Sequence, residues 1–223
     1  MTAAAPSLAR RPGAPDPGAV TRWWWVRHAP VPNPEARCYG QLDKEADCSD
    51  AALFAAQARL LPRNAVWYAS NLRRAIMTAE ALAAAGAAME RLNVEAALAE
   101  QSFGDWQGMT YAELGEMHGE SHHFWLVPPA KRAPNGESFL DLYERATAAI
   151  ARLTERHRGQ DIVAVAHGGT IRAALGLALN LGPEQAVRFE TGNVSLTCIE
   201  HFEAAQPEHA WRVSLVNHLP RLG

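Results

Sequence analysis

The stretch WWWVRHAP, residues 23–30, places four apolar residues directly before a cation and an imidazole. A short apolar run of this kind predicts a buried β-strand. The strand would end at Arg27 and His28 and deliver both side chains to the rim of a sheet. In open α/β sheets, ligands bind at that rim, outside the carboxyl ends of the strands.

Length and composition describe an ordinary globular protein. The chain has 223 residues, of which 48% are hydrophobic and 20% charged, and its formal net charge is -3. This balance disfavours a general nucleic-acid binder, which needs a large basic surface, and no apolar run has the length of a membrane span. We expect a cytoplasmic protein, because its three cysteines form no CxxC pair and are odd in number.

Apolar strand patterns alternate with helical patterns along most of the chain. Residues 65–69 and 161–166 predict two further buried strands, and residues 195–201 and 211–217 predict two antiparallel strands at a sheet edge. The alternation predicts an α/β fold with a mostly parallel sheet. We expect residues 1–20 to form a disordered tail rich in alanine and proline, and residues 21–223 to form one domain with a covering insertion near 109–137.

Two predicted strands each end in a histidine. His28 follows the opening strand, and His167 follows residues 161–166. Taken alone, each is more readily explained as a structural or solvated side chain, but two histidines at equivalent strand ends should point into one crevice. Gly168 and Gly169 come next and would let an anion approach the backbone N–H groups of a helix start.

Three charged residues could join these histidines. Arg27 precedes His28, and Arg74 lies in the first turn of a helix for which Ser70 is the expected N-cap. Two interpretations of the arginines stay open: ion pairs with surface carboxylates, or a clamp on a phosphoryl group, whose oxygens suit guanidinium forks. Glu100 follows an apolar run, so it is either a general acid or a solvated loop carboxylate.

Three other histidines, His118, His122 and His123, lie close together in the chain. No cysteine or acidic residue accompanies them at the spacing of a known metal site, so we predict no metal. The sequence also has no GxSxG elbow, no P-loop and no GxGxxG turn.

Five motifs, taken together and in order, resemble those of the histidine phosphatase superfamily, which has the phosphoglycerate mutase-like fold. Roughly residues 22–202 carry the resemblance, which implies a three-layer α/β/α sandwich and no cofactor. The five matches are Arg27-His28-Ala29; Ser70, Arg74, Ala75, Thr78 and Ala79; Glu100, Phe103, Gly104, Trp106 and Gly108; Gly136-Glu137-Ser138; and His167-Gly168.

The loop after the first motif departs from the family pattern. Ala29 replaces the usual glycine, and Val31 and Pro34 stand where threonine and asparagine are common, with Asn33 one residue away. The later segment, residues 37–43, is most similar to the alpha-ribazole phosphatase branch, which belongs to cobalamin assembly.

The resemblance implies a phosphatase that hydrolyses a small phosphate monoester, alpha-ribazole phosphate among the candidates, through a phosphohistidine on His28. It implies that Arg27, Arg74 and His167 hold the phosphoryl oxygens and that Glu100 protonates the leaving alkoxide.

Further substrate contacts are expected from Gly168, Asn33 and Gly40. Two alternatives stay open: a mutase, which returns the phosphoryl group to its substrate, and a catalytically silent relative that binds a phosphorylated partner. The predicted edge strand also allows a homodimer.

Overall fold

The fold is described from a computed structural model, over residues 18–118 and 127–220. Within these ranges six strands form one sheet in the order β3-β2-β4-β1-β5-β6. β5 runs antiparallel to both of its neighbours and the other pairs are parallel, which confirms the predicted mostly parallel sheet. The strand bounds are β1 (Val20–Arg27), β2 (Ala65–Ala69), β3 (Leu92–Val94), β4 (Asp161–Ala166), β5 (Leu196–Phe202) and β6 (Trp211–His218).

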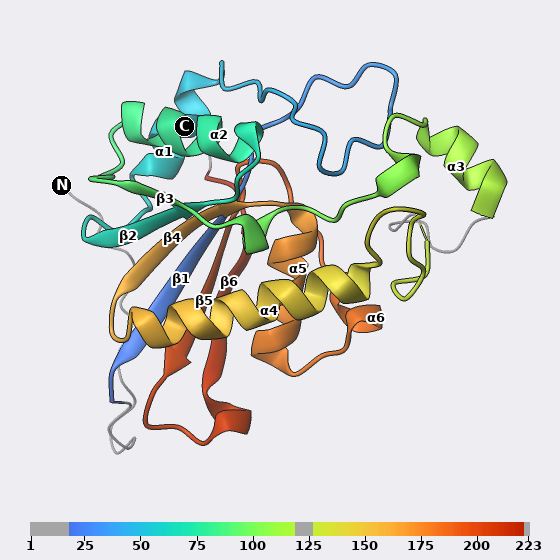
Figure 1. The fold of residues 1–223 in the computed structure, drawn as a ribbon. Helices are drawn as coiled ribbons and strands as arrows, with labels where there is room; N and C mark the ends of the chain where they lie inside the picture. The colour runs from blue at the N-terminus through green and yellow to red at the C-terminus, as the bar shows by residue number, and fades with distance from the viewer. Residues whose placement is uncertain (1–17, 119–126, 221–223) are drawn as a thin grey trace.

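Helices cover both faces of the sheet and complete the expected three-layer sandwich (Figure 1). One face carries α1 (Ala51–Ala58) and α2 (Arg73–Ala84), and the other carries α4 (Phe139–Arg156) and α5 (Gly168–Leu179). The short α6 (Pro183–Ala186) packs beside α5. Figure 1 shows α3 (Tyr111–His118) standing apart from the sheet, in the region where the covering insertion was expected.

The tryptophans of β1 show how strand periodicity builds two cores. Successive side chains of a strand point to opposite faces. Trp23 and Trp25 are fully buried on the α4 and α5 face, with their rings stacked 4.8 Å apart. Trp24 points to the α1 and α2 face, where its indole Nε1 donates a hydrogen bond to Asp161 at 3.0 Å. Burial of these rings on both sides therefore fixes the register of the central strand.

The start of α2 differs from the prediction that Ser70 caps it. The helix begins at Arg73, and its N-cap is Leu72, which supplies no side-chain hydrogen bond. The reason is tertiary: the Ser70 hydroxyl lies 2.6 Å from the Nε2 atom of His167 on another strand end. A helix that does follow its local signal is α4, where Ser138 and Asp141 form a complete capping box.

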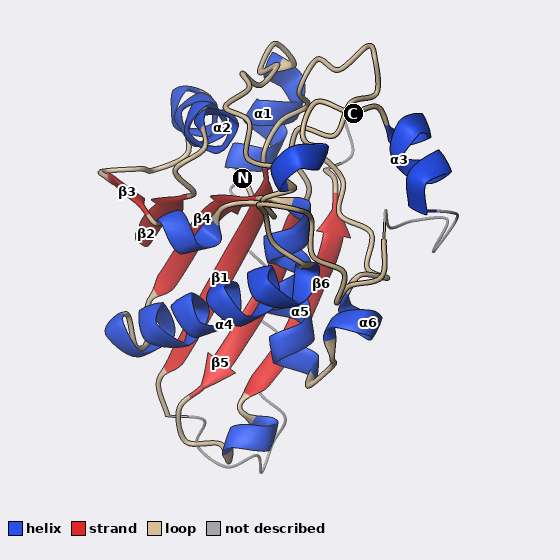
Figure 2. Cartoon of the chain, turned by 45° about the vertical axis from the view of Figure 1, so that its right-hand side comes forward, coloured by secondary structure: helices blue, strands red, loops and turns tan. Residues whose placement is uncertain are grey.

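The sheet topology decides where a ligand can bind. β1 and β4 are parallel neighbours in register from Arg22 opposite Asp161 to Arg27 opposite Ala166. The chain leaves β1 toward α1 on one face and leaves β4 toward α5 on the other (Figure 2). In open α/β sheets such a divergence marks the crevice, outside the carboxyl ends of the two strands, where ligands bind.

The predicted boundary between the tail, residues 1–20, and the domain, residues 21–223, lies at the start of β1. This strand begins at Val20, which the prediction assigns to the tail. Residues 1–17 of that tail lie outside the described part of the chain. None of the helices in the described ranges combines the length and the hydrophobicity required to cross a bilayer.

Candidate active site

His28 and His167 extend the two central strands at the crevice. The backbone N–H of His28 donates to the Ala166 carbonyl at 2.9 Å, which continues the β1–β4 ladder by one residue. The two imidazole centroids lie 5.1 Å apart, and both side chains are buried. The structure thus brings together the two strand-end histidines that are far apart in sequence.

The tautomer of His28 follows from its hydrogen bond. Its Nδ1 atom lies 2.7 Å from the carbonyl oxygen of Ala29, and a carbonyl can only accept, so Nδ1 carries the proton. Nε2 then holds a lone pair. Burial, reinforced by the positive charges of Arg74 and Arg27, lowers the pKa of His28 to about 3. At neutral pH the imidazole is therefore uncharged and nucleophilic at Nε2.

Ala29, which stands where the family has glycine, serves this arrangement through its backbone and its methyl group. Its N–H donates to the Thr78 hydroxyl at 2.8 Å, while its carbonyl accepts from His28. The methyl group is fully buried in the cluster that packs α1 and α2 on the sheet. The substitution is thus accommodated by core packing without loss of the histidine's partner.

His167 is also held neutral, with one nitrogen left over. Its Nε2 pairs with the Ser70 hydroxyl, and its buried Nδ1 has no hydrogen-bond partner among the described residues. Complete burial, reinforced by the positive charge of Arg74, lowers the pKa of His167 well below its usual value. If the Ser70 hydroxyl donates to Nε2, Nδ1 carries a proton that an anionic oxygen could accept.

Arg74 is a fully buried cation in the first turn of α2. Its Nη1 donates to the Leu42 carbonyl at 3.0 Å and its Nη2 to the Gly40 carbonyl at 2.6 Å, while its buried Nε has no partner in the described part of the chain. The preceding Arg73 instead points outward and pairs with Glu45 at 2.7 Å. Of the two neighbouring arginines, only Arg74 can therefore serve the crevice.

Arg27 and Arg172 place two more guanidinium groups beside Gly168. Arg27 donates through Nη1 to the Thr191 carbonyl, and Arg172 donates through Nε to the Phe189 carbonyl at 2.8 Å. A methyl group on Gly168 would lie 3.0 Å from Arg172 and 3.8 Å from Arg27. Burial lowers the pKa of Arg172 to about 10, which leaves it charged at neutral pH.

Glu100 reaches the crevice from the segment after β3. Its Oε1 atom accepts hydrogen bonds from the backbone N–H groups of Gln101 at 3.1 Å and Gly169 at 3.2 Å. A side chain at position 169 would force its neighbours to move, because a Cβ would lie 2.3 Å from that same carboxylate oxygen and 2.9 Å from Leu142. The Glu100 carboxylate is thus held by the backbone N–H of Gly169, which lies two residues after His167 in the chain.

A dense network fixes the backbone that carries Glu100. Arg145 on α4 donates to the carbonyls of Ala97, Ala99 and Glu100 at 2.9 to 3.0 Å. The same guanidinium forms a two-point pair with Glu137, at 2.7 and 2.8 Å. A bidentate pair of this kind is directional, so Arg145 of α4 fixes the position of the backbone that carries Glu100.

The two further substrate contacts expected in the loop after β1 have other partners. The Asn33 side chain is locked to the backbone N–H and carbonyl of Arg37, at 3.0 and 2.9 Å. Gly40 contributes its carbonyl to Arg74, and it adopts a positive φ of 43° where a Cβ would clash with Gln107. In this structure Asn33 and Gly40 therefore shape the loop, and Gly168 lies between the two arginines that flank it.

Sequence reasoning missed several residues of the site, above all Arg172 and Arg145. Arg172 lies four residues after Gly168 in α5, a spacing that puts both on one helix face, so this signal was available. No local signal marks Arg145, whose partners are brought to it by the packing of α4 against the segment before Glu100.

The histidines considered for a metal site play another part where they are described. His118 accepts from Lys131 at 2.9 Å, and its ring lies 4.5 Å from that of Trp106. His122 and His123 lie outside the described residues. Within the described ranges, no three histidine, cysteine or acidic side chains are grouped as metal ligands would be.

Comparison with known proteins identifies the family. The sequence model of the histidine phosphatase superfamily, branch 1, matches residues 23–214. Phosphoglycerate mutase-like protein 4 of Arabidopsis thaliana is 36% identical over 156 residues, 66% of each chain. Glucosyl-3-phosphoglycerate phosphatase of Mycolicibacterium vanbaalenii is 33% identical over 175 residues, 73% of this chain and 76% of that protein.

Solved structures share the fold. The native mycobacterial glucosyl-3-phosphoglycerate phosphatase superposes with a TM-score of 0.76 at 27% identity, over 89% of this chain and 99% of that one. An alpha-ribazole-5'-P phosphatase from Escherichia coli superposes with a TM-score of 0.72 at 21% identity, over 89% and 96%, which shows the fold alone.

The chain spans only part of some relatives: it matches 39% of a bifunctional protein of Mycobacterium tuberculosis, at 34% identity over 148 residues. The family model, in contrast, covers most of this chain, from β1 into β6. The protein belongs to the histidine phosphatase superfamily, branch 1.

Proposed function

We propose that this protein is a metal-independent phosphatase that hydrolyses a small phosphate monoester through a phosphohistidine on His28. The observation that carries the proposal is the His28 imidazole, neutral and bonded through Nδ1 to Ala29, beside the buried cation of Arg74. A neutral imidazole is a nucleophile, and the cationic groups around it favour an anionic ligand.

In the first step, the Nε2 lone pair of His28 attacks phosphorus and a P–N bond forms as the ester P–O bond breaks. Arg27, Arg74 and the Nδ1 proton of His167 stabilise the phosphoryl oxygens. Glu100 gives its proton to the departing alkoxide. Splitting the displacement in two lowers each barrier, and the hydrogen bond to Ala29 steadies the imidazole as it becomes positively charged.

In the second step, Glu100 takes a proton from a water molecule, which attacks phosphorus while the P–N bond breaks. The products are inorganic phosphate and the starting enzyme. General acid catalysis contributes a factor of about 10² to 10⁴ to the rate acceleration, whereas enzymes accelerate phosphate-monoester hydrolysis by up to about 10²¹-fold in total. Positioning, charge stabilisation and the covalent route must therefore supply most of the acceleration.

The decisive experiment is to trap the intermediate. After brief exposure to a labelled aryl phosphate, the wild-type protein should carry acid-labile, alkali-stable phosphate, and His28→Ala should carry none and release no phosphate. A protein that binds the substrate without labelling His28 would instead be a silent relative. Interconversion of phosphoglycerates without net phosphate release would identify a mutase.

The role of Glu100 has a separate test in the choice of leaving group. Glu100→Gln should slow hydrolysis of alkyl phosphates by about 10² to 10⁴, because their alkoxides need protonation. Aryl phosphates with good leaving groups should lose less. An equal loss on both substrate types would remove Glu100 from the acid role.

A screen of phosphorylated metabolites should include alpha-ribazole phosphate, which the loop of residues 37–43 suggests, together with phosphoserine and glucosyl-3-phosphoglycerate. We also place the enzyme in the reducing cytoplasm. The three cysteines, Cys38, Cys48 and Cys198, are free thiols, as expected in that compartment.

A further inference from the structure

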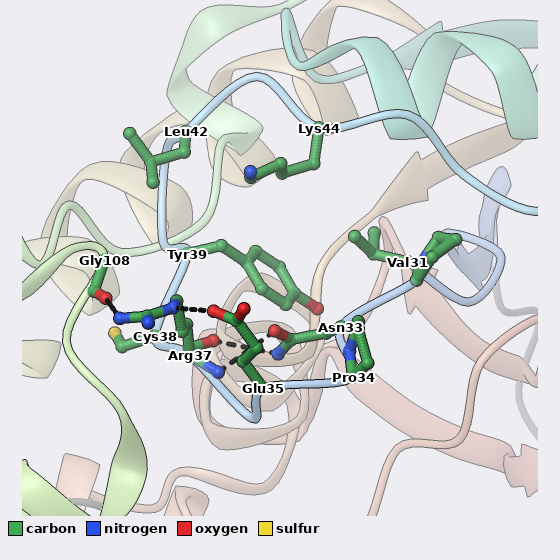
Figure 3. Close-up of a pocket in the computed structure, with 11 residues that line it drawn as sticks. Val31, Asn33, Pro34, Glu35, Arg37, Cys38, Tyr39, Leu42, Lys44 and Gly108 are labelled. Atoms are coloured by element: carbon green, nitrogen blue, oxygen red, sulfur yellow. Dashed lines mark hydrogen bonds and ion pairs between the residues drawn. The ribbon is translucent and has the colours of Figure 1, made fainter.

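The loop between β1 and α1, together with Gly108, lines an open cavity of about 160 Å³ that the mechanism above does not use (Figure 3). Its wall is mostly apolar and includes the ring of Tyr39. The other residues that line it are Val31, Pro32, Asn33, Pro34, Glu35, Arg37, Cys38, Leu42, Lys44 and Gly108.

The wall of this cavity is joined to the active site at two points. The Arg74 guanidinium lies 5.0 Å from the centre of the Tyr39 ring, and the carbonyl of Leu42, another wall residue, accepts from Arg74. Next to Leu42, the Gln41 side-chain amide donates to the Glu100 carbonyl at 2.8 Å. The cavity therefore adjoins both the cation proposed to hold the phosphoryl group and the acid proposed to protonate the leaving group.

Most polar groups of the wall already have partners in one another. Arg37 donates to Glu35 and, at 2.6 Å, to the Gly108 carbonyl, and Asn33 is locked to the Arg37 backbone. Two wall residues are exceptions within the described ranges: the Lys44 ammonium group has no hydrogen bond or ion pair, and the Tyr39 hydroxyl has no hydrogen bond. Figure 3 shows Lys44 reaching across the same space as Leu42 and the Tyr39 ring.

These features define a chemical class. A cavity of about 150 Å³ lined by apolar side chains holds benzene, so this one fits a single ring or an equally small carbon skeleton. One free ammonium group matches one negative charge. A second phosphoryl group would call for guanidinium forks, and the fork of Arg37 is already occupied.

We propose that this cavity holds the leaving group of the substrate, a small carbon skeleton whose carboxylate pairs with Lys44. The inference rests on the proposed phosphatase function, because the cavity is assigned to the part of the substrate beyond the phosphate. Tyr39 would then contact both the substrate skeleton and Arg74, and Lys44 would select carboxylated phosphate esters.

Binding of two non-hydrolysable probes tests the subsite without relying on turnover. The dissociation constants of phenylphosphonate and 4-carboxyphenylphosphonate are measured by calorimetry. The wild type should bind the carboxylated probe roughly fivefold more tightly, the size of an exposed ion pair. Lys44→Met should abolish this preference, and Lys44→Arg should retain it.

The chain supplies a matched control in its other lysine, Lys131, which pairs with His118 away from the cavity. Lys131→Met should keep the wild-type preference. Equal binding of the two probes by the wild type, or equal loss in both lysine variants, would overturn the subsite.

Phosphate release from phenyl phosphate separates the two proposals. Hydrolysis together with a preference that Lys44→Met leaves unchanged would refute the subsite and leave the phosphatase standing. A preference that depends on Lys44 without any hydrolysis would refute the phosphatase and leave a binding site. Failure to bind either probe would refute both.

Discussion

The imidazole rings of His28 and His167 lie 5.1 Å apart at a tilt of 53°, each at the end of one of two neighbouring parallel strands. Both are buried beside Arg74, which favours their uncharged forms. The site thus keeps its positive charge on arginines, while the Nε2 atom of His28 carries no proton. The positive groups are therefore already in position before an anionic ligand binds.

The protonation state of His28 should stay constant through the neutral range. Because its pKa is lowered to about 3, we expect Nδ1 to be protonated and Nε2 bare at every pH from about 5 to 8. Nitrogen-15 NMR of the histidine side chains reads both states directly. A His28 signal that titrates near its ordinary value of 6.5 would contradict the burial argument.

The same pKa shift predicts how stability depends on pH. The unfolded His28 takes up a proton below about 6.5 and the folded one only near 3, so the unfolded state binds more protons between these values. Stability should therefore fall as pH drops through that window, by up to about 1.4 kcal/mol per pH unit from this group. Urea unfolding of wild type and His28→Gln should show a shallower acid slope in the variant.

Ser70 should act through His167. Removal of its hydroxyl in Ser70→Ala leaves Nε2 of a fully buried imidazole without a partner and frees the ring to change tautomer. We expect kcat/KM to fall roughly tenfold, the usual size of one buried hydrogen bond. The His167 nitrogen shifts should change with it, and Ser70→Thr, which restores a hydroxyl, should recover both. Unchanged kcat/KM and shifts in a folded Ser70→Ala would assign Ser70 to packing alone.

Gly169→Ala should displace the general acid. The added methyl group would lie 2.3 Å from the Glu100 carboxylate, so the carboxylate must move. Hydrolysis of alkyl phosphates should then fall by about 10² or more, and that of 4-nitrophenyl phosphate much less.

Gly115→Ala is the control for this change, since Gly115 lies in α3 with open space around it. It should leave activity unchanged and stabilise the helix by about 0.5 to 1 kcal/mol. Equal losses on both substrates in Gly169→Ala would show general damage to the site.

Arg74→Lys should keep the positive charge at this position but lose the planar, two-pronged set of hydrogen-bond donors of the guanidinium group. An ammonium group cannot reach the carbonyls of Gly40 and Leu42 and also bind phosphoryl oxygen in the geometry of the guanidinium. Loss of one such donor costs about 10² to 10³ in kcat. Arg73→Lys, at the exposed neighbour that pairs with Glu45, should have nearly wild-type kinetics. Similar kinetics in the two variants would exclude a special role for Arg74.

Local sequence patterns were sufficient for the sheet and for the approximate place of the site. Apolar runs in β1 and β4 report burial on both faces, and a residue that follows such a run must lie at a strand end. His28 and His167 could be assigned to one rim for this reason. The capping box at Ser138 likewise depends only on neighbours three residues apart.

The chemistry of each side chain at that rim was decided by tertiary packing. Ser70 has the local signal of a helix cap, yet its hydroxyl pairs with His167, 97 residues away. Arg145 carries no local signal that separates it from a surface cation until α4 packs beside the segment of Glu100. Periodicity records which face of an element is buried, whereas the partner of a polar group depends on which elements meet, and only the folded chain brings those elements together.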